Sequence, residues 1–121
     1  MARSVLDRLR SLCLKLPEAH EVEAWGAPTF RVKNKIFAMY AYADTHAGAG
    51  KNAVWFNANS TNQGLLVRAE PERYFVPPYV GPKGWVGAYL GKETDWAAVA
   101  DLARDAYRLT ATKKLAAQLI D

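Results

Sequence analysis

The sequence predicts an α+β domain with two layers, in which an antiparallel sheet of about five strands carries its helices on one face. Apolar residues recur at three- and four-residue spacing near both ends of the 121-residue chain, which is the spacing of amphipathic helices. Between these ends lie short segments rich in β-branched and aromatic residues, separated by tight turns. Strands joined by tight turns pair antiparallel, and the helices need one shared face of the sheet to bury their apolar sides.

The composition is that of an ordinary globular chain, and we expect residues 1–121 to form a single domain. Lys and Arg number 16 against 12 Asp and Glu, so the net charge of +4 permits contact with nucleic acid without requiring it. The single cysteine, Cys13, excludes an internal disulfide. No apolar run could span a membrane, and the charged N-terminus does not fit a secretory leader. We therefore expect a cytoplasmic protein, as a monomer or a weak dimer.

The first half of the chain is predicted to form one helix and three strands. Apolar spacing after Ser4, a plausible N-terminal cap, indicates a helix that Pro17 ends. Gly26 and Pro28 interrupt the next apolar segment, which predicts two strands with a bend between them. Asn34 readily adopts positive φ, so it predicts a tight turn into a returning strand. The expected elements are a helix at 5–16, two strands within 22–32, and a strand at 36–42.

The second half is predicted to alternate strands and helices. Ser60 or Thr61 could cap a short helix, and Pro71 favours the start of one more helical turn. Either Thr94 or Asp95 could cap the long helix near the C-terminus. The expected elements are a strand at 53–58, a short helix holding 65–67, a helical turn at 71–74, a strand at 85–90, a helix that includes 96–107, and a last helix from about residue 110.

Residues 75–84, which we call the Pro/Gly loop, hold three prolines and two glycines. Proline fixes φ and lowers the entropy of the unfolded chain, so we expect this loop to be ordered. Trp25, Tyr79 and Trp85 are candidates for an aromatic ligand surface. The loop could instead be a lid that closes one end of the core, which is favoured because buried aromatic residues are far commoner than binding sites. We expect Trp85 to be a core residue.

Several long patches of this chain resemble a known family. They are residues 25–32 (WGAPTFRV), 35–38 (KIFA) and 77–87 (PPYVGPKGWVG), together with 95–109 as a closing helix. In this order, over nearly the whole chain, they resemble the MmcQ/YjbR family. The resemblance implies a fold similar to the frataxin-like CyaY proteins and a DNA-binding function, although a fold does not fix a function. Asn57 stands where family members often carry a strand lysine, and Ala106 stands where a serine is common.

Five cations are candidate contacts for double-stranded DNA. Arg31, Lys33 and Lys35 gather at the tip of the predicted hairpin, and Arg73 and Lys83 lie before and within the Pro/Gly loop. Cations on a hairpin can lie along phosphates and bind a duplex weakly, without sequence preference. Their spacing alone favours an ordinary solvated surface, and the resemblance brings the two interpretations level. If the family's strand lysine contacts phosphate, its absence predicts weaker binding here.

No catalytic constellation is recognisable, so we expect a protein that is more a binder than an enzyme, with no cofactor and no metal. His20 and His46 stand in different segments, without carboxylate or cysteine ligands at metal-binding spacing. Iron, which the frataxin-like resemblance suggests, would need clustered carboxylates, whereas the first helix offers mainly Arg and Lys. The alternatives to DNA binding are a protein-interaction module or a small-molecule-binding protein that uses the aromatic Pro/Gly loop.

Overall fold

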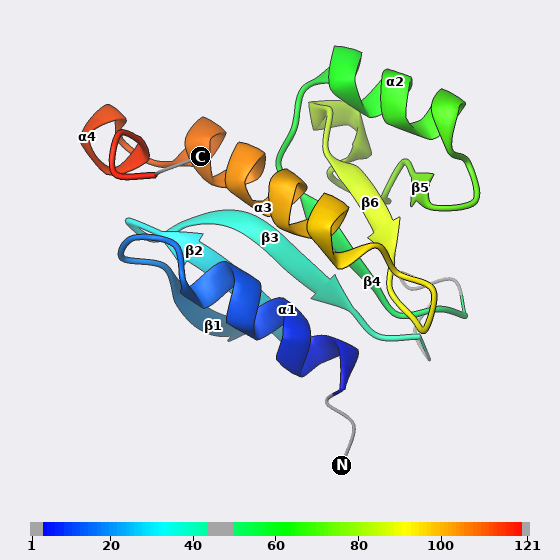
Figure 1. The fold of residues 1–121 in the computed structure, drawn as a ribbon, viewed down its shortest axis with the longest axis horizontal. Helices are drawn as coiled ribbons and strands as arrows, with labels where there is room; N and C mark the ends of the chain where they lie inside the picture. Colours follow the sequence, from blue (N-terminus) through cyan, green and yellow to red (C-terminus); the bar gives the residue numbers. More distant parts are fainter. Residues whose placement is uncertain (1–3, 44–49, 120–121) are drawn as a thin grey trace.

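The computed structural model describes residues 4–43 and 50–119, which fold around a six-stranded antiparallel sheet in the order β1-β2-β3-β4-β6-β5 (Figure 1). The strands are β1 (His20–Ala24), β2 (Ala27–Val32), β3 (Lys35–Ala41), β4 (Ala53–Phe56), β5 (Tyr74–Phe75) and β6 (Val86–Tyr89). The predicted α+β class is confirmed. The helical turn predicted at 71–74 is wrong in its last residue, because Tyr74 leaves the turn to pair with Ala88 as the start of β5.

Helices α1 (Val5–Leu14) and α3 (Trp96–Thr110) lie across one face of this sheet, as predicted (Figure 1). Helix α2 (Ser60–Ala69) lies beside β5 and β6, and the short α4 (Lys113–Ala116) follows α3. A one-turn 3-10 helix, η1 (Gly81–Lys83), lies within the Pro/Gly loop. Among the residues that the structure describes, no helix is long and apolar enough to cross a membrane.

Side-chain oxygens satisfy the free backbone N–H groups at the helix starts. Ser4 Oγ accepts from Asp7 N at 3.0 Å, and Asp95 Oδ1 caps α3, as two of the predictions had it. The cap of α2 is Asn59, whose Oδ1 accepts from Asn62 N at 2.8 Å, and not either of the two residues that follow it. Asn59 holds the extended backbone conformation of a cap, whereas the next residue is already helical. Similarly, the last helix begins at residue 113 and not near 110.

Two hairpins turn through pairs of residues with positive φ. The β1–β2 turn is Trp25 (φ 53°) with Gly26 (φ 78°), and the β2–β3 turn is Lys33 (φ 49°) with Asn34 (φ 64°). Positive φ at both central residues is the conformation that matches the twist of a two-residue hairpin. Glycine and asparagine adopt it readily, but Trp25 does so at a cost.

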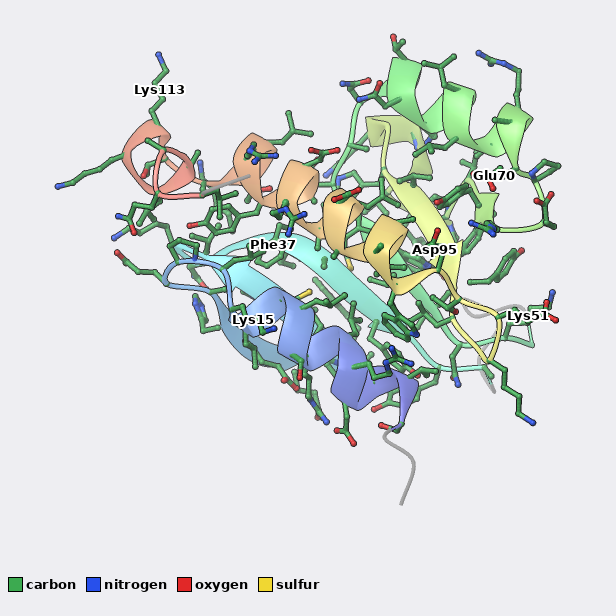
Figure 2. The ribbon with its side chains drawn as sticks, viewed as in Figure 1. Lys15, Phe37, Lys51, Glu70, Asp95 and Lys113 are labelled. Atoms are coloured by element: carbon green, nitrogen blue, oxygen red, sulfur yellow. The ribbon has the colours of Figure 1, made fainter. Side chains whose placement is uncertain are left out.

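The cross-strand register assigns side chains to the two faces of the sheet, because paired residues point to the same face. One row lies under α1 and α3 and consists of Phe30, Ala38, Phe56 and Val86, all buried. Phe37 also lies there, between β3 and α3, with its ring edge-on to Tyr107 at 5.7 Å (Figure 2). We call this the helix-side core. The adjacent row faces the other way and consists of Thr29, Met39, Trp55, Gly87 and Phe75.

Candidate functional site

A groove of about 700 Å³ lies on the face of the sheet opposite α1 and α3. We call it the aromatic groove. One wall is the β1–β2 turn with Trp25, the other is the Pro/Gly loop with Tyr79, and Met39 and Trp55 lie between them on the sheet. Its lining residues are Ala24, Trp25, Gly26, Ala27, Thr29, Met39, Tyr40, Ala41, Tyr42, Trp55, Tyr79, Val80 and Lys83.

The two aromatic side chains of the walls are unusually open to solvent. Trp25 is 81% exposed and Tyr79 is 72% exposed. Both residues also hold positive φ, at 53° and 65°, a backbone conformation that costs an ordinary L-residue roughly 1–2 kcal/mol. Neither hydrophobic burial nor backbone preference therefore explains a large ring at these positions. Strained residues that persist in a native structure are often functional ones.

The Pro/Gly loop is fastened to α2, which fixes the position of Tyr79. Gln63 Nε2 donates to the carbonyl oxygens of Gly81 and Trp85, at 2.9 and 2.6 Å. Gly84 (φ 91°) lies so close to α2 that a Cβ there would be 2.7 Å from Ser60 N. A side chain at this position would push the loop away from the helix. These contacts fasten the loop wall to α2.

Trp85 lies beneath this loop, with only 8% of its surface exposed. It packs with Ala41, Ala53 and Trp55 in a small second cluster, which we call the loop-side cluster. The prediction that Trp85 is a core residue is confirmed. The two interpretations of the Pro/Gly loop therefore apply to different side chains, since Trp85 closes the core while Tyr79 stays exposed beside the groove.

Trp55, a residue of the groove floor, has a buried indole N–H without a partner among the described residues. Trp55 is 6% exposed, and its Nε1–H has no acceptor among the residues that the structure describes. A buried N–H without a partner costs about 1–3 kcal/mol, so each one in a native structure calls for an explanation. Nearby, Thr29 Oγ1 is satisfied, because it donates to Val22 O and accepts from Arg31 Nε at 3.1 Å.

Lys83 is the only charged side chain among the described residues that line the aromatic groove. It is exposed, and the structure places it in no ion pair with a described residue. With no carboxylate in the lining, the groove carries a local positive charge at its edge. The other polar side-chain groups of its lining residues are hydroxyls and the indole N–H groups of Trp25 and Trp55.

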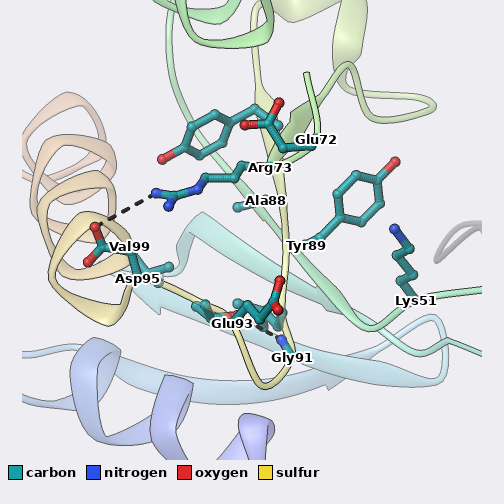
Figure 3. Close-up of a pocket in the computed structure, with 12 residues that line it drawn as sticks. Lys51, Glu72, Arg73, Ala88, Tyr89, Gly91, Glu93, Asp95 and Val99 are labelled. Atoms are coloured by element: carbon teal, nitrogen blue, oxygen red, sulfur yellow. Dashed lines mark hydrogen bonds and ion pairs between the residues drawn. The ribbon is translucent and has the colours of Figure 1, made fainter. Parts of the chain in front are cut away.

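A second pocket, of about 540 Å³, has the opposite character (Figure 3). Arg73 reaches from beside β5 toward Asp95 at the start of α3, with Nη1 and Oδ2 3.7 Å apart, and its Nε lies 3.4 Å from Glu70. Lys51 lies over the ring of Tyr89, 4.8 Å from its centre. Charges of both signs offset one another here, and Asp95 already caps α3. The pocket is accounted for by structural ion pairs.

The cations predicted to bind DNA do not all lie on one face of the sheet. Arg31 points to the face opposite the helices, where it bonds to Thr29, whereas Lys33 Nζ pairs with Glu18 Oε1 at 3.1 Å. Lys35 is exposed and lies opposite Val32 in the β2–β3 strand pair. Because Val32 belongs to the helix-side core, Lys35 points to the helix side of the sheet. Arg73 is held in the ion pairs described above, and Lys83 belongs to the aromatic groove. Arg31, Lys33 and Lys35 are close in sequence. Side chains alternate along a strand, however, so Arg31 and Lys35 point to opposite faces of the sheet.

Asn57, where the family often has a lysine, faces α3. Its Nδ2 donates to Thr110 Oγ1 at 2.8 Å, and that hydroxyl donates to Ala106 O. Thus Asn57 here links the end of β4 to the end of α3. Two lysines of α4 lie nearby in the chain, and Figure 2 shows one of them, Lys113, pointing away from the molecule.

The remaining reactive side chains are the single cysteine and the two histidines. Cys13 is fully buried, and burial raises the pKa of its thiol, with a smaller contribution from Glu21. His20 is exposed, and His46 lies outside the described residues. Within residues 4–43 and 50–119 there is no group of three or more His, Cys, Asp or Glu side chains placed to hold a metal ion.

Sequence reasoning proposed Trp25 and Tyr79 for the aromatic surface but missed the groove floor. Trp55 and Met39 lie in segments predicted as strands, and the alternation placed Trp55 on the face opposite Val54 and Phe56. The missing step was that this second face stays partly uncovered. A pair of bulky apolar side chains on the face that helices do not cover is the signal that could have found it.

Comparison with solved structures identifies the class of fold. A solved structure of an α+β protein from Deinococcus radiodurans, the crystal structure of protein DR2400 with a DUF419 domain, superposes on this chain with a TM-score of 0.72 and 21% identity. The match covers 86% of this chain and 76% of that one, and at this identity it establishes the fold alone. A search of curated proteins finds no match.

The family follows from the sequence itself. The YjbR family model matches residues 14–109, which is most of the chain, so this protein belongs to the YjbR family. The resemblance inferred from the aromatic and Pro/Gly patches is confirmed. Those patches are also the segments that build the two walls of the aromatic groove.

Proposed function

We propose that this protein is a binding protein whose ligand carries a planar ring, and that the ring lies in the aromatic groove between Trp25 and Tyr79. The observation that carries the proposal is the pair of exposed rings at strained backbone positions, on opposite walls of one groove. Two fixed aromatic walls favour a flat ligand, because offset stacking and edge contacts add to the burial of apolar surface.

The size and composition of the groove support a small ligand. Its volume of about 700 Å³ lies within the ordinary range for small-molecule sites, roughly 300–1,000 Å³. Most of its lining is apolar or aromatic, with a few polar groups that could fix a ligand's orientation. The loop wall is fastened through Gln63 and Gly84, so little ordering cost opposes binding.

The test uses the indole N–H signals of the four tryptophans in an NMR spectrum of labelled protein. Quinoline and adenine serve as planar probes, and cyclohexanol serves as a non-planar one. We expect the planar probes to shift the signals of Trp25 and Trp55. Trp96 packs against the helix-side core under Arg8 and should stay still, which makes it an internal control.

Two variants and a control complete the test. Trp25→Asn and Tyr79→Asn keep a residue that tolerates positive φ and should abolish the shifts. Leu65→Ala removes an exposed apolar side chain on α2, away from the groove, and should leave them unchanged. Equal shifts for cyclohexanol, or shifts that survive both Asn variants, would exclude this function.

Weak duplex DNA binding is the second candidate, supported by cations at the end of the molecule that holds the β2–β3 turn. Lys35, Lys113 and Lys114 are exposed and make no ion pair with a described residue, although Lys33 does. Three phosphate contacts would give a slope of about −3 for log affinity against log salt. Lys35→Ala should flatten it by about one unit, with Lys92→Ala as the matched control. If fluorescence anisotropy on a labelled duplex detects no binding at low salt, DNA binding is excluded.

A further inference from the structure

We infer that the ligand of the aromatic groove is an aromatic anion, a planar ring that carries one negatively charged group. This inference rests on the proposed function and adds the charge of the ligand. The ring lies between Trp25 and Tyr79, and the negative group pairs with Lys83.

The charge is the informative part, because clustered aromatic rings alone could equally hold a cation. Aromatic cages bind quaternary ammonium groups through the negative faces of their rings. Here the groove has no described carboxylate to help a cation, and Lys83 at its edge repels one. The same lysine attracts an anion, and no described acid competes for it. The electrostatics of the site therefore select an anion over a cation.

The experiment compares three probes that share one ring and differ in charge. Indole-3-acetate is an anion, indole-3-acetamide is neutral, and tryptamine is a cation at neutral pH. We expect the anion to bind about fivefold more tightly than the amide, as one partly exposed ion pair allows, and the cation to bind most weakly. The preference should shrink as salt rises from 20 to 500 mM, because salt screens exposed charges.

Variants of Lys83 separate charge from shape. Lys83→Gln should equalise the three affinities, and Lys83→Glu should reverse their order. Lys92→Gln changes an exposed lysine outside the groove and should preserve the order. Thymidine and thymidine 5′-monophosphate form a second pair, and a preference for the monophosphate larger than that for indole-3-acetate would indicate a nucleotide source over a carboxylate source.

The outcomes distinguish this inference from the function on which it rests. If none of the probes shifts Trp25 and Trp55, the proposed function fails. If all three indoles bind with equal affinity, or tryptamine binds best, the function stands and the anion inference is overturned. An anion preference that persists in Lys83→Gln would also overturn it, since the charge would then act elsewhere.

Discussion

Phe56 and Trp55 are neighbours in β4, but their side chains lie in opposite environments. Phe56 is fully buried in the helix-side core, where α1 and α3 cover the sheet. Trp55 is buried by a much smaller cluster beneath the Pro/Gly loop and forms part of a groove. A helix covers a strand face evenly along its length, whereas a loop covers only part of it. Strained, exposed aromatic residues of a turn and a loop line the groove on this face of the sheet.

The comparison predicts that the helix-side core contributes most of the stability. Phe56→Ala should lower the free energy of unfolding by about 3–5 kcal/mol, because a large buried ring is replaced by a cavity. Urea unfolding followed by circular dichroism measures this change. A loss below about 1 kcal/mol would mean that the core under the helices can collapse around the missing ring.

Trp85→Ala tests the loop-side cluster by the same measure. We expect a loss of about 3 kcal/mol, at the lower end of the range for a buried Trp, because its cluster is smaller and one side is the groove. Planar probes should also bind less well, since the cluster supports the floor. A melting temperature within a degree or two of the parent protein would contradict the burial of Trp85.

Gly87 tests how closely the loop side is packed. Phe75 of β5 is the cross-strand partner of Gly87 in β6. A Cβ at Gly87 would collide with the ring of Phe75. Gly87→Ala should therefore cost about 1–3 kcal/mol through overpacking. Gly91→Ala is the matched control, because nothing lies within 4 Å of a Cβ there, and it should change stability by less than about 0.5 kcal/mol. Equal costs at the two glycines would contradict the close contact.

The buried thiol of Cys13 makes the free energy of unfolding depend on pH. Burial raises the pKa of its thiol above that in the unfolded chain, so the folded state favours the protonated form. The resulting stability is complete below about pH 8.5 and declines as the pH rises, by about 1.4 kcal/mol at pH 9.5. Urea unfolding at pH 7.5 and 9.5 measures the decline. Cys13→Ala should lack this component, and an equal decline in both proteins would assign it to other groups.

Trp25→Asn should change stability least among these variants and yet remove binding. Asn-Gly is a favoured pair for a hairpin turn with two positive φ values, so stability should stay the same or rise by up to about 1 kcal/mol. Binding of planar probes should disappear in the same variant. Thermal melting and probe titration together check it. A loss of more than 1 kcal/mol would mean that Trp25 has a structural role.

Much of this architecture could be predicted from local patterns. Helical spacing gave α1 and α3, and alternation in β4 separated Val54 and Phe56 from Trp55. The error at Tyr74 arose from a contact distant in sequence. Tyr74 joined β5 because β6 offered an open edge, a partner more than ten residues away. The sequence showed that the cations near the β2–β3 turn are close along the chain, but not which face of the sheet each one occupies.

The sequence by itself determined the class of fold, the family and the segments that matter, because periodicity, caps, turns and motif patches are local. Only the tertiary structure decided that Tyr79 and Trp25 line one groove while Trp85 lies buried. It also decided that Lys83 stands alone at that groove whereas Arg73 is held by Glu70 and Asp95. The physical reason is that exposure and charge pairing depend on which segments meet, and the long connections of this chain bring those segments together.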